Sequence, residues 1–161
     1  MKNSFKDQLE KEGIINVRGH LYKRITKEQI ASRNIVYLAM NRSNGLTLRN
    51  YNSRNKYVVI VSVIDETHIV GSLLINTDPN IENTQIGDQQ YPLSTNDYPD
   101  ALDYKSWLDC SLLFEIEISQ IETGYHAGYI NQRDWGYIVE TLKNSPTISN
   151  KKKRKYNILE L

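Results

Sequence analysis

Short β-type runs separated by polar stretches dominate the hydrophobic pattern of this chain. Residues 34–40 and 57–64 are rich in β-branched side chains, and the continuous apolar run over 57–64 is typical of a strand buried on both faces. A third run over 68–75 follows a short polar turn, which predicts a hairpin of two adjacent strands. Residues 107–118 return to strand character and end in alternating apolar and glutamate positions. The pattern therefore predicts a protein built mainly from strands.

One helix is predicted clearly near the end of the chain. Apolar side chains recur at i, i+3, i+4 and i+7 from Trp135 and form a single stripe. Asn131 is a suitable N-cap for this helix, and Pro146 ends it. Shorter helical segments are expected over residues 4–12 and, as a single turn, over 25–30.

The connecting segments differ in composition. Residues 41–56 are polar and basic, and they contain Asn-Gly as a turn signal. Residues 76–106 hold three of the four prolines and read as a long acidic loop, with a short edge strand at 91–93. Residues 122–128 contain two glycines and are expected to form a turn.

This order of elements favours a mainly β, α+β fold, in which a small β-barrel carries a C-terminal helix across it. The expected organisation is an N-terminal helical extension over residues 1–32, a barrel domain over 33–149 and a basic tail over 150–161.

Charge is divided unevenly along the chain, although the formal net charge is only +1. Residues 1–57 carry a net charge of +8, residues 58–149 carry −11, and residues 150–161 carry +4. Such a division suggests separate faces, with the basic parts facing nucleic acid. Solvated surface charge is an equally open interpretation.

Composition narrows the class of protein. The mean hydropathy is −0.56, and the apolar runs are far shorter than a membrane span. The first residues are polar and charged, without the apolar segment of a signal peptide, so a cytoplasmic protein with no membrane association is expected.

No metal site and no cofactor are expected. The single cysteine, Cys110, lies in a predicted strand and is expected to be a buried thiol. His20, His68 and His126 are far apart, show no ligand spacing and are interpreted as structural. The glycines form no phosphate-binding loop.

Several weak motifs, taken in order, resemble the MazF/PemK/Kid family of toxin endoribonucleases, which adopt an SH3-like or CcdB-like barrel. The matching segments span residues 33–145 and read RNIVYL at 33–38, RNKYVVIVS at 54–62, LINT at 74–77, CSLLFEIE at 110–117 and GYINQRDWGYI at 128–138.

The resemblance is incomplete at two functional positions. The proline that follows the family's arginine is absent after Arg54, and Phe114 stands where the family has a second arginine. The loop over 76–106 is also longer than is typical of the family.

The resemblance implies the toxin of a type II toxin–antitoxin system, a homodimer that cleaves single-stranded RNA without a metal and is inhibited by a small antitoxin protein. Arg54 and Thr77, which are 23 residues apart, match the family's catalytic spacing. Arg54 is expected to stabilise the charge on the scissile phosphate, and Thr77 to position the 2′-hydroxyl or the phosphate. Ordinary surface and turn roles for both residues stay open.

Four further residues are candidates for RNA binding: Arg42, Arg49, Lys56 and Asn76. The basic side chains would follow the phosphates, and the asparagine amide would bond to a base edge or to the backbone. Two alternatives remain. Phe114 favours a barrel that has lost catalysis and serves as an RNA- or protein-binding module, and the similarity to the family is also compatible with an unrelated small barrel.

Overall fold

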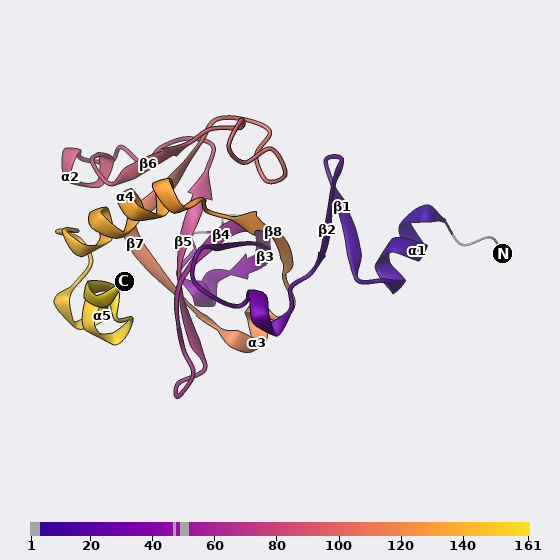
Figure 1. Ribbon diagram of the computed structural model, residues 1–161, viewed down its shortest axis with the longest axis horizontal. Coiled ribbons are helices and arrows are strands. Elements are labelled where there is room, and N and C mark those ends of the chain that lie inside the picture. The colour runs from indigo at the N-terminus through magenta and orange to yellow at the C-terminus, as the bar shows by residue number, and fades with distance from the viewer. Residues whose placement is uncertain (1–3, 47, 49–51) are drawn as a thin grey trace.

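Eight strands form one antiparallel sheet in this computed structural model, which describes residues 4–46, 48 and 52–161 (Figure 1). Their order across the sheet is β1-β2-β8-β3-β4-β5-β7-β6. The strands are β1 (Ile14–Val17), β2 (His20–Arg24), β3 (Asn34–Asn41), β4 (Ser53–Ile64), β5 (Ile69–Asn76), β6 (Gln90–Leu93), β7 (Ser106–Glu117) and β8 (Tyr125–Tyr129).

The helices are short, apart from α4 (Gln132–Lys143), which lies across the sheet in Figure 1. Asn131 caps α4 by accepting a hydrogen bond from the Asp134 amide, as the sequence predicts. The other α-helices are α1 (Phe5–Lys11), α2 (Thr84–Gly87), α3 (Ile118–Ile121) and α5 (Asn150–Lys155), and the 3-10 turns are η1 (Lys27–Gln29), η2 (Arg42–Asn44) and η3 (Ile158–Glu160). No helix in the described ranges is long and apolar enough to span a membrane.

The central strand β4 is buried on both faces, as its continuous apolar run predicts. Val59 and Val61 face a core that also holds apolar residues of α4 and η3. Val58 and Ile60 face a second core on the opposite side of the sheet. Side chains alternate along a strand, so this one segment contributes to both apolar layers.

The expected mainly β, α+β class is confirmed, and the sheet is not closed into a barrel. Strands β1 and β6 stand at the two ends of the order, and no pairing joins them in the described part of the chain. The β1–β2 hairpin and α1 extend away from the body of the molecule (Figure 1).

The N-terminal segment is more structured than the sequence pattern indicates. Residues 14–24 form a hairpin, and β2 continues the sheet by pairing with β8 at Lys23 and Arg24. Tyr22 and Ile25 are both buried, each in a different core. Residues 14–25, which belong to the segment predicted as an extension, thus contribute to the sheet and to its packing.

Two segments differ from their predicted structure. Most of the segment 122–128, expected to form a turn, lies in strand β8 (Tyr125–Tyr129), which runs between β2 and β3. Strand β4 begins at Ser53, so Arg54 and Lys56 are strand residues and not part of the preceding loop. The hairpin of β4 and β5 and the edge strand β6 lie where the sequence predicts them.

The basic C-terminal segment folds against the sheet. Tyr156 and Ile158 are fully buried in the core on the α4 side. A Cβ atom added at Gly71 of β5 would lie 2.9 Å from the Tyr156 ring, so glycine there makes room for the tyrosine. The tail is therefore a packed part of the domain.

Candidate functional site

The tip of the β1–β2 hairpin holds an arginine in an uncommon backbone conformation. Arg18 and Gly19 form the two-residue turn with φ angles of 52° and 91°. Positive φ at both central positions suits the twist of a tight hairpin, and glycine adopts it without strain. Arginine adopts it rarely, and such strain is concentrated at functional sites. The Asn16 Oδ1 atom fixes the turn by accepting a 2.8 Å bond from the Gly19 amide.

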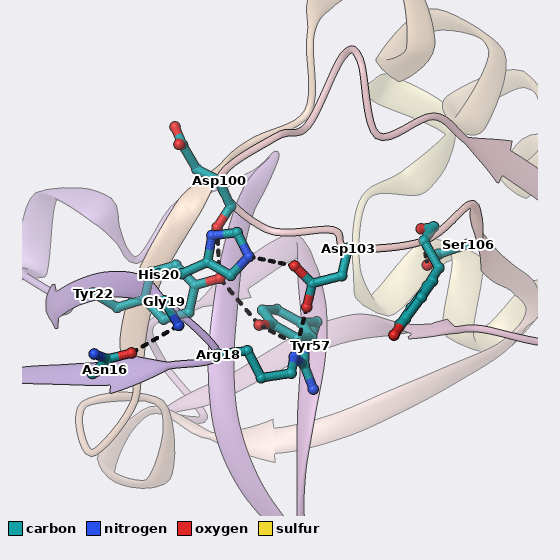
Figure 2. Close-up of polar contacts among 10 residues, drawn as sticks. Asn16, Arg18, Gly19, His20, Tyr22, Tyr57, Asp100, Asp103 and Ser106 are labelled. Carbon is teal, nitrogen blue, oxygen red and sulfur yellow. Dashed lines mark hydrogen bonds and ion pairs between the residues drawn. The ribbon is translucent and has the colours of Figure 1, made fainter.

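Two side chains of this tip hold the Asp103 carboxylate (Figure 2). The Arg18 Nε atom donates to Oδ2 of Asp103 at 2.6 Å, and the His20 Nε2 atom lies 2.7 Å from Oδ1. The hydrogen bonds from His20 and Arg18 hold the pKa of Asp103 below its usual value. Burial is the largest single influence on the Arg18 pKa and lowers it, but the hydrogen bond to Asp103 and the charge interactions with Tyr57 and Asp103 together raise that pKa above its usual value. The carboxylate therefore stays ionised at neutral pH.

A pair of tyrosines lies beside this ion pair. The Tyr57 hydroxyl is 3.0 Å from that of Tyr22, which donates to the Asp100 carbonyl at 2.6 Å. The Arg18 Nη2 atom reaches the Tyr57 hydroxyl at 3.5 Å. Burial raises the pKa of both tyrosines, so each keeps its proton at neutral pH. Because the Tyr22 proton goes to the Asp100 carbonyl, the Tyr57 hydroxyl is the donor in its contact with Tyr22.

A small pocket of about 90 Å³ opens next to these groups. It lies where the hairpin tip meets the end of β5 and the start of β7, and its lining includes Arg18, Tyr57, Asn76, Thr77, Asp103 and Tyr104. The pocket thus places a guanidinium, a carboxylate and several hydroxyls around one space.

The other face of the same sheet end is basic. The Lys56 ammonium donates to Oδ1 of Asn76 at 2.9 Å, which links β4 to β5. Burial, and then the charge of Arg54, lower the pKa of Lys56. Arg54 lies two residues earlier on β4 and is exposed, so both cations share one face of the strand. Close by, the Lys105 ammonium lies 4.5 Å from the centre of the Trp107 ring.

Four of the residues predicted from sequence gather at this end of the sheet. Thr77 and Asn76 line the pocket, and Lys56 bonds to Asn76 from the neighbouring strand. Arg54 follows the same strand outward but is not part of the pocket lining. No side-chain contact between Arg54 and Thr77 is present among the described residues.

The two remaining predicted residues lie in the segment between β3 and β4. Arg42 is in η2, and its Nη2 atom donates to the Leu48 carbonyl at 2.8 Å. That bond holds Arg42 against its own loop. Arg49 lies outside the described residues.

The sequence pattern did not indicate that Arg18, His20 or Asp103 belong to a site, and His20 was expected to be structural. His20 and Asp103 are 83 positions apart, so no local motif joins them. The one usable sequence signal was the glycine after Arg18, which marks a tight turn and therefore an exposed arginine at its tip. His126, in contrast, bonds to Asn34 within the sheet and fits the structural role expected of it.

The described residues offer few other groups suited to metal binding or catalysis. No group of three His, Cys, Asp or Glu residues there is arranged to hold a metal ion. Cys110 is buried, and burial raises the pKa of its thiol. The thiol therefore stays protonated and unreactive at neutral pH, as expected of a core cysteine. Phe114 is also buried and packs beneath Gly45 in the core opposite α4, so it does not face the pocket.

Similarity to known proteins is found among solved structures. The chain matches no protein-family model and no curated protein. Among solved structures it is similar to the Mycobacterium tuberculosis toxin MazF-mt6, with 12% sequence identity and a TM-score of 0.46. The alignment covers 71% of this chain and 97% of the other. The chemistry of the site is accordingly inferred from its own side chains.

Proposed function

We propose that this chain is an endoribonuclease that cleaves single-stranded RNA without a metal ion or cofactor and acts as the toxin of a type II toxin–antitoxin pair. The observation that carries the proposal is the pocket at the hairpin tip, where Arg18, Tyr57, Thr77 and Asp103 come together and His20 bonds to Asp103 from beside the pocket. The order of sequence motifs shared with the MazF/PemK/Kid family supports the toxin assignment.

Metal-independent RNA cleavage uses the 2′-hydroxyl as an internal nucleophile. The reaction needs a group that accepts the 2′ proton, a group that stabilises the charge of the phosphorane, and a proton for the leaving 5′ oxygen. Imidazole is suited to moving protons near neutral pH, and guanidinium is suited to binding phosphate oxygens. Arg18 lines the pocket, and His20 lies just outside its lining, 2.7 Å from the carboxylate of the pocket residue Asp103.

We assign proton transfer to His20 and charge stabilisation to Arg18. Thr77 keeps the role predicted from sequence, which is to position the 2′-hydroxyl or the phosphate from the lining of the pocket. Tyr57 retains its proton at neutral pH and donates it to the phosphate once its hydroxyl turns away from Tyr22. Arg18 thus takes the part that the sequence motif suggested for Arg54.

The basic face next to the pocket supports RNA binding. Arg54, Lys56 and Lys105 are placed to bind phosphates that flank the cleaved bond, and Asn76 joins this face to the pocket. Contacts of this kind depend on salt and carry little sequence information. A homodimer and a small antitoxin partner remain part of the proposal on the strength of the family resemblance.

Cleavage of a single-stranded RNA in the presence of EDTA tests the proposal. We expect His20→Ala to slow cleavage by about 10²- to 10⁴-fold, which is the usual contribution of general acid–base catalysis. His68→Asn is the matched control, because His68 is exposed in a turn with a φ of 55° that asparagine tolerates. Equal loss of activity in both variants would contradict the assignment.

A second pair of variants distinguishes the proposed roles of Arg18 and Arg54. Arg18→Asn keeps a residue that tolerates the turn, and we expect it to slow cleavage by about 10²-fold or more. Arg54→Ala is expected to weaken RNA binding in a salt-dependent way with a smaller effect on the rate at saturation. The reverse ranking would return the catalytic role to Arg54.

The alternative function, an RNA-binding module without catalysis, predicts a different result in these assays. It would bind the RNA with the salt dependence expected of Arg54 and Lys56 and leave the strand intact. The burial of Phe114 in the core is compatible with this alternative, since no arginine reaches the site from β7 at that position.

A further inference from the structure

We infer that Arg18, His20 and Tyr57 form a binding site for a phosphate group and that the Asp103 carboxylate fills this site in the structure as an internal substitute. The inference rests on the proposed function for the identity of the natural ligand, an RNA phosphate. In addition, Asp103 blocks the site until its side chain moves out.

The geometry of Asp103 is that of a bound oxyanion. One carboxylate oxygen receives the Arg18 Nε bond at 2.6 Å, and the other lies 2.7 Å from the His20 Nε2 atom. These are the lengths of charge-assisted hydrogen bonds, which phosphate oxygens form with the same donors. Beyond the carboxylate, the Arg18 Nη2 atom donates to the Tyr57 hydroxyl at 3.5 Å, so a second guanidinium nitrogen and a hydroxyl lie at the edge of the site.

The contact of Asp103 is exchangeable because it lies at the surface. The Arg18 side chain is 60% exposed and that of Asp103 is 27% exposed. Ion pairs with this much solvent access contribute little stability, since water competes for both partners. A phosphate offers the same donors more acceptor oxygens than a carboxylate does, so it is able to take the place of Asp103.

The loop that carries Asp103 does not have to unfold for this exchange. Ala101 and Leu102, the two residues before Asp103, are buried in the core, and the Asp100 carbonyl is held by the Tyr22 hydroxyl. These contacts anchor the backbone on one side of Asp103. Rotation of the single aspartate side chain out of the site is then sufficient to open it.

Binding of inorganic phosphate tests the site without reference to RNA. The imidazole signals of His20 are followed by NMR while phosphate is added to the wild-type chain, to Asp103→Asn and to the control Asp100→Asn. Asp100 is exposed in the same loop, and only its backbone carbonyl contributes to the cluster. We expect Asp103→Asn to bind phosphate more tightly than the other two proteins by about two- to fivefold, which is the factor that an exposed ion pair supplies.

Two outcomes overturn the inference. Equal phosphate affinity in all three proteins would mean that Asp103 does not occupy the site. Tighter binding that persists after Arg18→Asn is added to Asp103→Asn would place the phosphate elsewhere. Asp103→Ser, which also removes the charge, replaces Asp103→Asn if thermal unfolding shows that the asparagine variant is not folded.

Parallel RNA measurements separate this inference from the proposed function. We expect Asp103→Asn to bind a single-stranded RNA oligonucleotide more tightly than wild type, by fluorescence anisotropy. Tighter phosphate binding without any RNA binding or cleavage would support the blocked site and contradict the proposed nuclease. Unchanged RNA affinity with a lost cleavage rate would show that Asp103 positions His20, and the inference would fail.

Discussion

Two basic segments flank the strands that the sequence predicts most clearly, and the structure uses them in opposite ways. In the C-terminal segment, Lys152 and Lys155 both pair with Glu115, and Lys153 is buried. In the N-terminal hairpin, Arg18 stands exposed at a turn and meets Asp103 beside a pocket. Formal charge along a sequence therefore says little about function until each cation's partners are known.

The C-terminal segment is expected to be the more important of the two for stability. Tyr156→Ala removes a fully buried ring beneath Gly71, so we expect it to lower the free energy of unfolding by about 3–5 kcal/mol. Phe5→Ala in the exposed α1 is expected to change it by less than about 0.5 kcal/mol. Urea denaturation measures both, and similar values for the two variants would remove the contrast between the segments.

Substitution of Lys153 is expected to lower stability by less than that of Tyr156, because it removes hydrogen bonds and not a buried ring. Its ammonium donates to the carbonyls of Lys143 and Ser145 at 3.0 and 2.7 Å and so closes the end of α4. Lys153→Met leaves these acceptors without their donor, and we expect a loss of about 1–3 kcal/mol in the free energy of unfolding. Lys151→Met, at an exposed position on α5, is the control and should leave stability nearly unchanged. Unchanged free energy of unfolding in both variants would show that the buried ammonium does not hold the segment in place.

Substitution of Glu115 is expected to change stability least, and the change should depend on pH. Hydrogen bonds from Lys155 and then from the Tyr156 hydroxyl lower the pKa of Glu115. Because its folded pKa lies below the unfolded value, its contribution is present at pH values above the unfolded pKa. That contribution is lost as the pH falls through the folded pKa.

Glu115→Gln should therefore lower stability at pH 7 by less than about 1 kcal/mol, because the side chain is partly exposed. The difference from wild type should shrink as the pH falls below about 4, near the ordinary value for glutamate. Thermal unfolding at pH 7 and at pH 3 measures it, with Glu117→Gln as the exposed control. A difference that grows towards low pH would have the wrong sign for this ion pair.

Much of the sheet could be predicted from the sequence because its strands are long and strongly apolar. The runs that became β4, β5 and β7 have a period and a length that leave few alternatives. Strand β8 was not predicted because Gly124, just before it, and Gly128, within it, are typical of turns. Gly124 is required instead by a close approach, since a Cβ atom there would lie 2.6 Å from the Val36 side chain.

The candidate site could be predicted only in part. The strand-end residues Asn76 and Thr77 and the neighbouring Lys56 were found because their positions follow from the strands. The cluster of Arg18, His20 and Asp103 depends on a hairpin and a loop that meet only in three dimensions. Periodicity and local propensity do not encode such long-range contacts.

RNA cleavage beside the hairpin tip is tested most directly by the products that the purified wild-type chain forms from single-stranded RNA in EDTA. Attack by the 2′-hydroxyl, with His20 moving the proton and Arg18 stabilising the phosphorane, predicts fragments that end in a 2′,3′-cyclic phosphate, and His20→Ala should remove them. Intact RNA at protein concentrations that bind it, or the same products at an unchanged rate from His20→Ala, would contradict the proposed site.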